Sequence, residues 1–351
     1  MKSDNVALRW LIVAPASVLL GLLFAWWNVP AGWILAGILA SGASALLSGV
    51  ELPLNRFVNR VGRGTIGMLA GIPLAGVALG ELAGYLAPGL VVALVVVVAG
   101  IVGGLLLART EPEISRETGV LSMLAGGSSV MPVLAKELGA DFRYVALSQY
   151  LRLLAVSMTL PLVTAFFTTP AAAGGVTPPS VNWWMFPVVL LIAFFGMDLG
   201  KFLRLPSPGI FGPLAITVVL ALTLPAGWSL QPPEFFRVFA FLVVGWMCGG
   251  ALSMPALRLF ARQLPATIVF IVGLSAVCAL LAVPIMHWVG ITYFEAYLAT
   301  SPGAIETALA LSSEGGAGPA VVAIQLIRLL GVLLIAGWLP QILRFLLRGR
   351  A

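Results

Sequence analysis

Charged residues are scarce in this chain of 351 residues. Lys, Arg, Asp and Glu together make up 9% of it, whereas hydrophobic residues make up 60%. Soluble domains carry roughly 25% charged residues, so this composition excludes a soluble domain of any size. The 19 basic and 13 acidic residues leave a net charge of +6, and the basic residues are scattered through short loops. That scatter argues against a nucleic-acid partner, which would need a basic patch.

Histidine and cysteine are almost absent. His287 is the single histidine, and Cys248 and Cys278 stand far apart in expected helices. These three residues cannot build the usual copper, zinc or di-iron centres. The chain also has no glycine-rich phosphate loop followed by lysine, which argues against ATP-driven transport by this chain alone. We therefore expect no metal, no cofactor and no enzyme.

Apolar runs long enough to cross the hydrocarbon core of a bilayer recur along the whole chain. The first run, Met1 to Trp27, has a basic start and an apolar middle, as signal peptides do. It ends in the bulky Trp26-Trp27-Asn28 instead of a small-residue cleavage site, so we expect it to remain as the first helix. The predicted fold class is an all-α polytopic membrane protein embedded in the lipid bilayer.

The second half of the chain repeats the first. The stretch Gln149–Val156 (QYLRLLAV) returns as Gln325–Val332 (QLIRLLGV), 176 residues later. The same offset pairs Pro30 with Pro206, Ile34 with Ile210, Gly127 with Gly303, and Gly139 with Gly315. We therefore expect two repeats, 1–169 and 183–351. They are joined by a periplasmic linker, 170–182, which is uncharged and rich in Pro and Gly.

Each repeat contains five continuous apolar segments and one that is interrupted. We expect continuous helices at 9–27, 31–49, 64–80, 88–108 and 143–168, and at 183–200, 208–226, 238–255, 265–287 and 317–342. Segments 118–136 and 296–314 are broken halfway by glycine, serine or proline. Backbone that leaves a helix at membrane depth must be buried in protein or line a wet cavity. We therefore expect both segments to be re-entrant helical hairpins.

The positions of lysine and arginine favour this topology. With five crossings and one hairpin per repeat, all but three of the 19 basic residues fall on the cytoplasmic side. The exceptions are Arg237, which falls outside, and Arg152 and Arg328, which lie within helices. If the broken segments crossed fully, six basic residues would move outside. Because each repeat has an odd number of crossings, the second repeat is inverted relative to the first. The total number of crossings is even, which places both termini in the cytoplasm.

Two repeated polar pairs lie inside apolar helices. Gln149 and Arg152 are three residues apart and share a helix face, as do Gln325 and Arg328. Arg152 lies nine residues beyond Arg143, roughly 13 Å by helical rise, which is too deep for an interface residue. An arginine at a helix centre costs about 2.5–3.5 kcal/mol to insert, so something must offset that cost. Two interpretations stay open: an anion site or charge relay, or hydrogen bonds that tie down hairpin carbonyls.

Glu306 follows the break in the second hairpin, and its equivalent in the first repeat is Val130. At a half-helix N-terminus, an acid can bind a cation or shuttle a proton. It can equally form an ion pair with Arg152 or Arg328, or remain neutral. The difference between Glu306 and Val130 means that function need not be symmetric between the repeats.

The hairpins supply further candidates. Ser128 or Ser129 is the expected N-cap of the second half-helix in the first hairpin, and Ser301 is the expected N-cap in the second. Two opposed half-helix N-termini would direct partial positive charge at the midplane. The candidate residues for substrate binding and coupling are Glu306, Arg152, Arg328, Gln149, Gln325, Ser128, Ser129, Ser301, Gly127, Gly303 and Thr307.

These motifs carry a family resemblance. The segment Leu121 to Leu162, with Gly126-Gly127, Gly139-Ala140-Asp141 and Gln149-x-x-Arg152, resembles the AbrB-duplication family of bacterial inner-membrane proteins. The segment from Ser301-Pro302-Gly303 to Gln325-x-x-Arg328 resembles it too, so the likeness covers nearly the whole chain. The resemblance implies a bacterial inner-membrane location. Members are often labelled as ammonia monooxygenases, and one is named as a regulator of gene expression.

We expect a secondary transporter with a midplane site between the hairpin tips and the Gln-x-x-Arg helices. The two arginines and the helix N-termini favour a small anion or zwitterion as solute, with proton or sodium coupling through Glu306. The alternative is a membrane-embedded sensor or regulator that affects gene expression without transport. A membrane monooxygenase ranks last, because its metal ligands are missing. A homodimer is left open.

Overall fold

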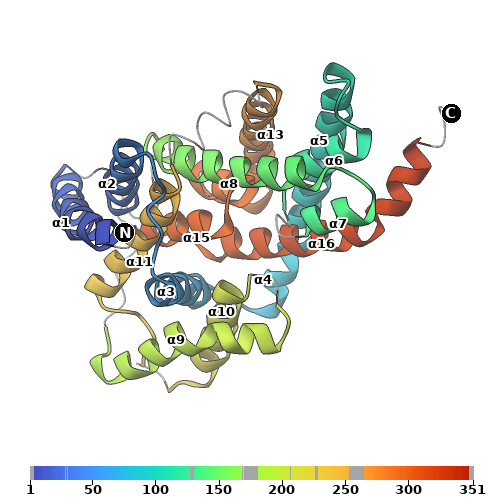
Figure 1. The fold of residues 1–351 in the computed structure, drawn as a ribbon. Helices are drawn as coiled ribbons and strands as arrows, with labels where there is room; N and C mark the ends of the chain where they lie inside the picture. The colour runs from blue at the N-terminus through green and yellow to red at the C-terminus, as the bar shows by residue number, and fades with distance from the viewer. Residues whose placement is uncertain are drawn as a thin grey trace. The chain divides into compact units, whose positions relative to one another are not determined.

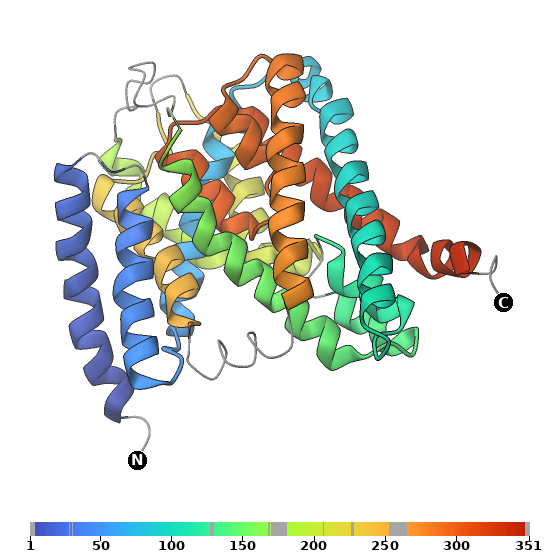
Figure 2. The same ribbon diagram turned by 90° about the horizontal axis from the view of Figure 1, so that it is seen from above.

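The computed structural model describes residues 4–27, 29, 31–126, 130–167, 169, 181–205, 207–225, 228–252 and 265–347. Within these ranges every regular element is a helix (Figures 1 and 2). The predicted all-α class is therefore confirmed for the described part of the chain. Of the predicted linker, only residues 181 and 182 are described.

The helices of the first half are α1 (Asp4–Trp26), α2 (Gly32–Ser48), α3 (Arg56–Ala75), α4 (Leu79–Gly84), α5 (Leu86–Thr110), α6 (Arg116–Met123), α7 (Met131–Glu137) and α8 (Phe142–Thr164). Those of the second half are η1 (Trp183–Met185), α9 (Phe186–Phe202), α10 (Pro208–Thr223), α11 (Glu234–Gly250), α13 (Pro265–Val289), α14 (Tyr293–Thr300), α15 (Ile305–Glu314) and α16 (Pro319–Leu347). Each expected continuous helix overlaps one of these elements. Each broken segment consists of two short helices, α6 with α7 and α14 with α15.

Several helices have the length and composition of membrane spans. Among the described residues, five segments are long and apolar enough to cross a membrane: Val6–Trp26, Gly80–Thr110, Phe142–Thr164, Trp183–Phe202 and Ile268–Val289. Three further apolar helices are shorter: Gly32–Ser48, Pro208–Thr223 and Pro319–Ile335. The chain therefore has the helical character of a membrane protein, while ten crossings stay a prediction.

Helix α3 begins at Arg56, eight residues before the predicted start at residue 64. The side-chain oxygen of Asn55 accepts a hydrogen bond from the backbone N–H of Phe57 at 2.8 Å, which is a regular N-cap. The added turns carry Arg56, Arg60 and Arg63 at helical spacing. The prediction was wrong here because the stretch up to residue 63, with its three arginines, was assigned to a cytoplasmic loop.

The chain forms two compact units, and each unit draws on both halves of the sequence. Unit 1 comprises Met1–Ala78, Ser157–Leu259 and Ala304–Val322, and unit 2 comprises Leu79–Val156, Phe260–Gly303 and Ala323–Ala351. Three of the five boundaries fall inside α8, inside α16, and between α14 and α15. The second broken segment is thus divided between the units, whereas the first lies wholly in unit 2.

Unit 1 is a bundle in which α1 lies beside α2, α2 packs against α11, and α3 contacts α9, α10, α11 and α15 (Figures 1 and 2). Helices α2 and α11 approach closely where glycine faces glycine. A Cβ atom placed on Gly245 would lie 2.8 Å from the Cα of Gly37 and would collide with the carbonyl oxygen of Ile34. Small residues at such crossings let apolar helices pack backbone to backbone.

In unit 2, α5 packs against α6 and against α13, and α13 packs against α14 (Figure 2). The first broken segment is part of its core. Val120, Leu121 and Leu124, from the end of α6 and the break, are buried in one cluster with Val97 and Val332. The backbone of the break therefore lies among apolar side chains.

The contact between α2 and α11 generates a stability prediction. Replacing Gly245 by leucine forces the two helices apart, and overpacking of this kind typically costs about 1–3 kcal/mol. We expect Gly245→Leu to lower the apparent Tm of the detergent-solubilised protein. Gly273→Leu is the matched control, because no atom lies within 4 Å of a Cβ placed at that exposed glycine of α13. Equal Tm values for the two variants would contradict the close approach.

Candidate functional site

The first helix break begins where α6 ends, at Met123. The N-terminus of α6 is capped by Ser115, whose hydroxyl accepts a hydrogen bond from the backbone N–H of Thr118 at 3.2 Å. After the helix, Gly126 adopts a φ of +106°, a conformation that side chains rarely tolerate. A Cβ on Gly126 would also lie 3.1 Å from the side chain of Val332. Glycine at this position therefore allows the backbone to leave the helix inside a packed core.

Gln149 and Arg152 satisfy the carbonyl groups at the end of α6. The side-chain amide of Gln149 donates to the carbonyl oxygens of Leu121 at 2.7 Å and Leu124 at 2.9 Å. Nη1 of Arg152 also donates to the carbonyl oxygen of Leu124, at 2.7 Å. Nη2 of Arg152 donates to Oε1 of Gln149 at 2.9 Å, which joins the two side chains. Carbonyls that a helix C-terminus leaves unpaired are thereby hydrogen-bonded.

The second break follows α14 and has the same arrangement. The side-chain amide of Gln325 donates to the carbonyl oxygen of Leu298 at 2.5 Å. Nη1 of Arg328 donates to the carbonyl oxygens of Thr300, at 3.2 Å, and Ser301. Nη2 of Arg328 donates to Oε1 of Gln325 at 2.6 Å. In both pairs, therefore, the glutamine orients the arginine and both side chains cap one half-helix.

All four side chains are buried, and both arginines face neutral oxygens. Arg152 is 2% exposed and Arg328 is 6% exposed. Placing a cation at a helix C-terminus is favourable by about 0.3–1 kcal/mol, and by up to about 2 kcal/mol in a partly buried geometry. Unit 2 therefore holds two buried arginines whose hydrogen bonds described above go to neutral oxygens.

Glu306 lies in unit 1, in the first turn of α15, where the N-cap residue is Ala304. Its Oε1 accepts a hydrogen bond from Nη2 of Arg63 at 2.5 Å, and the side chains are 15% and 26% exposed respectively. The described ion-pair partner of Glu306 is thus an arginine of α3. The predicted partners were Arg152 and Arg328. Arg63 was not predicted, because it lies just before the expected start of its helix at residue 64.

Thr307 and Cys248 form a polar contact beside the ion pair of Arg63 and Glu306, and the four residues are called the polar cluster here. Thr307 is buried, and its hydroxyl lies 3.8 Å from the sulfur of Cys248 on α11. Because α3, α11 and α15 contact one another, the cluster ties the start of α15 to two neighbouring helices.

The remaining candidates divide into three cases. Ser301 is buried, but its hydroxyl donates to the carbonyl oxygen of Leu298 at 3.0 Å. It is the C-cap of α14 and not the predicted N-cap of α15. Gly303 lies in the break after α14 and is the last residue of the unit 2 segment Phe260–Gly303. Gly127, Ser128 and Ser129 lie outside the described residues.

The Gln–Arg caps generate a prediction about stability. Gln325→Ala removes one of the two side-chain donors to the Leu298 carbonyl and leaves the buried Nη2 of Arg328 without its described acceptor, at a cost of about 1–3 kcal/mol. We expect a clear fall in unfolding free energy, measured by denaturant titration in detergent micelles. Leu330→Ala on the exposed face of the same helix is the control and should change little. A Gln325→Ala protein as stable as that control would argue against the cap.

The ion pairs of α3 generate a second prediction. A double-mutant cycle with Arg63→Ala and Glu306→Ala should give a coupling energy of about 1–2 kcal/mol, because this pair is mostly buried. The neighbouring pair of Arg60 and Asp198 is the internal comparison, since the Asp198 side chain is 52% exposed. Its coupling should stay below about 1 kcal/mol. A larger coupling for the exposed pair would refute this ranking.

Comparisons with known proteins agree with the motifs described above. The family model described as "Transition state regulatory protein AbrB" matches residues 33–346. A protein of Escherichia coli K12 described as "Putative regulator AbrB" is 30% identical over 348 residues, which cover 97% of each chain. "Uncharacterized protein YhjN" of Bacillus subtilis 168 is 26% identical over 374 residues, covering 99% of this chain and 95% of its own length. The resemblance carried by the glycine, glutamine and arginine motifs is thus confirmed, and the chain belongs to the AbrB family.

Proposed function

We propose that this protein is a secondary transporter of a small anionic solute in a bacterial inner membrane. The observation that carries the proposal is the pair of buried arginines in unit 2, each held at a helix break by neutral oxygens. Buried charges inside apolar helices are expensive, and in membrane proteins they mark substrate or ion pathways. A solute with negative charge would be attracted by the two positive charges that these arginines place inside apolar helices.

The helix breaks support the same function. In secondary transporters, substrate and coupling ions bind where helices are interrupted, because freed backbone groups and helix ends face the site. Both arginines here hydrogen-bond carbonyls at such interruptions. Glu306 has Arg63 as its ion-pair partner, so its carboxylate is already engaged within unit 1. Proton or sodium coupling at Glu306 would therefore have to compete with Arg63.

The proposal includes two inverted repeats of five crossings and one re-entrant hairpin, with both termini in the cytoplasm. Both ends of α14 lie 177 residues after the ends of α6, and their N-caps, Thr292 and Ser115, have the same offset. Ala31 and Ser207, which precede α2 and α10, are 176 residues apart, and both adopt the left-handed conformation, with φ of 58° and 45°. These correspondences support the duplication that the sequence pattern predicts.

A second candidate is a membrane-embedded regulator that does not transport. The names of the relatives favour it, since one is described as a regulator. Such a role would need a partner protein, because the composition leaves no room for a soluble signalling domain. An enzymatic role is not part of the proposal. Among the described residues, no group of three or more His, Cys, Asp and Glu side chains could hold a metal ion.

Transport in proteoliposomes separates these candidates. We expect uptake or efflux of at least one member of a panel of small organic and inorganic anions. Arg152→Gln and Arg328→Gln should each reduce that flux at least tenfold, because each removes one of the two positive charges. Arg237→Gln is the matched control, since Arg237 pairs with Glu234 at a partly exposed site in unit 1. Its flux should be near that of the unmodified protein.

Two outcomes would contradict the proposal. One is a transported solute whose flux is unchanged in both arginine variants, provided that both remain folded in detergent. The other is an absence of flux for every anion together with a stable complex between the protein and a regulatory partner. Stoichiometric copper or iron in the purified protein would instead restore the monooxygenase candidate.

A further inference from the structure

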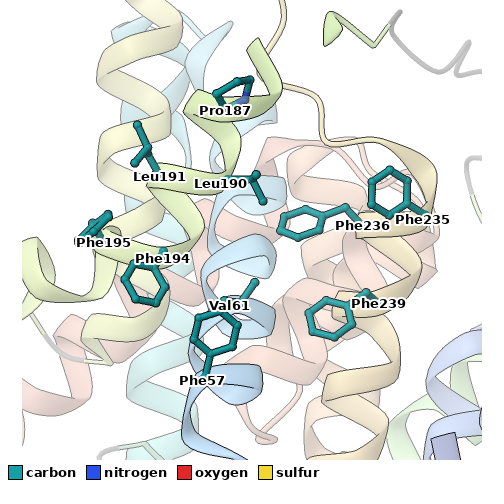
Figure 3. A pocket seen from close by; sticks show the side chains of 10 residues that line it. All are labelled: Phe57, Val61, Pro187, Leu190, Leu191, Phe194, Phe195, Phe235, Phe236 and Phe239. Atoms are coloured by element: carbon teal, nitrogen blue, oxygen red, sulfur yellow. The ribbon is translucent and has the colours of Figure 1, made fainter. Parts of the chain in front are cut away.

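Unit 1 carries an open apolar groove between α3, α9 and α11 (Figure 3). Its volume is about 840 Å³, and all ten lining side chains are apolar. Six of them are phenylalanines, contributed by all three helices. Phe57, Leu191, Phe195 and Phe235 are each more than half exposed, so the groove is unfilled by the protein's own side chains. A groove of this composition accepts a hydrocarbon chain far more readily than a polar solute.

The length of the groove suits one acyl chain. Its lining on α9 runs from Pro187 to Phe195, which spans roughly 12 Å at the helical rise of 1.5 Å per residue. Half of a hydrocarbon core of about 30 Å is about 15 Å. The length of the groove is therefore close to the thickness of one leaflet, which an acyl chain spans.

One end of the groove is strongly basic. The guanidinium group of Arg60 lies 4.9 Å from the centre of the Phe194 ring, at the wall of the groove. Asp198 holds Arg60 by an ion pair, and the same carboxylate lies 4.0 Å from Lys201. Arg56 on α3 and Arg204 beyond α9 are exposed at the same end. Four cations against one carboxylate give this end a net charge of +3.

We propose that the groove binds an anionic phospholipid, with an acyl chain along the phenylalanines and the phosphate at the basic end. Basic clusters beside apolar surfaces are the usual recognition sites for anionic headgroups in membrane proteins. The lipid would fill the space between α9 and α11 and neutralise part of the excess charge. This inference is independent of the solute and of the buried arginines of unit 2.

The charge also decides between a lipid and a second copy of the chain. A two-fold interface joins the same patch of both copies, so the excess positive charge of both grooves would be brought into one interface. That contact would bring +3 against +3 at close range, which opposes dimerisation through this face. An anionic lipid meets the same end with complementary charge.

Native mass spectrometry of the delipidated, full-length protein tests the lipid site. Phosphatidylglycerol and phosphatidylcholine with identical acyl chains are titrated in neutral detergent. We expect phosphatidylglycerol to bind at least tenfold more tightly. Leu190→Trp fills the groove and should weaken phosphatidylglycerol binding at least tenfold. Leu280→Trp, at an exposed position of α13 in unit 2, should leave it unchanged.

The basic end is tested with a triple variant, Arg56→Gln, Lys201→Gln and Arg204→Gln, which leaves Arg60 and its ion pair intact. We expect this variant to bind both lipids with equal affinity. Its matched control, Arg109→Gln, Arg116→Gln and Arg143→Gln in unit 2, should keep the preference for phosphatidylglycerol. Equal binding of the two lipids to the unmodified protein would overturn the proposal. Self-association that Leu190→Trp abolishes, without any lipid preference, would show that the groove is an interface between copies.

Discussion

The structure depends on the hydrogen bonds that satisfy backbone carbonyl groups where its apolar helices are interrupted. Each break frees carbonyl groups at the end of a half-helix, and a hydrocarbon environment offers no water to satisfy them. Gln149 with Arg152, and Gln325 with Arg328, supply the missing donors from a neighbouring helix. This requirement explains why two polar residues stand in the middle of apolar helices, why they are three residues apart, and why the arrangement occurs twice.

Capping and solute binding are compatible roles for these arginines. A guanidinium group held by a carboxylate has its charge cancelled, whereas one held by carbonyl and amide oxygens keeps it. Gln149 and Gln325 fix the orientation of the arginines by accepting one hydrogen bond each. The same contacts that stabilise the breaks therefore also position two charged groups rigidly, as a binding site requires.

Much of this architecture could be predicted from the sequence, because helix length, apolar periodicity and glycine breaks are local properties. The halves of both broken segments and the Gln-x-x-Arg pairs were found in this way. The pairing of Arg63 with Glu306 was not, since it joins residues 243 positions apart and depends on where α3 begins. Ser301 was misassigned for a related reason. A serine between two half-helices can serve either one, and only its hydrogen bond to Leu298 decides.

The arginines discussed above differ between the two units in their burial and in the groups to which they donate hydrogen bonds. In unit 1, Arg60 and Arg63 have carboxylate partners, and the excess positive charge lies at an exposed end of the apolar groove. In unit 2, Arg152 and Arg328 are buried and held by neutral oxygens. Salt screens exposed charges over a Debye length of about 8–10 Å but acts far less on buried ones. The proposed attraction of a lipid headgroup to the groove should therefore weaken with ionic strength. The proposed attraction of a solute to the buried arginines should depend on ionic strength far less.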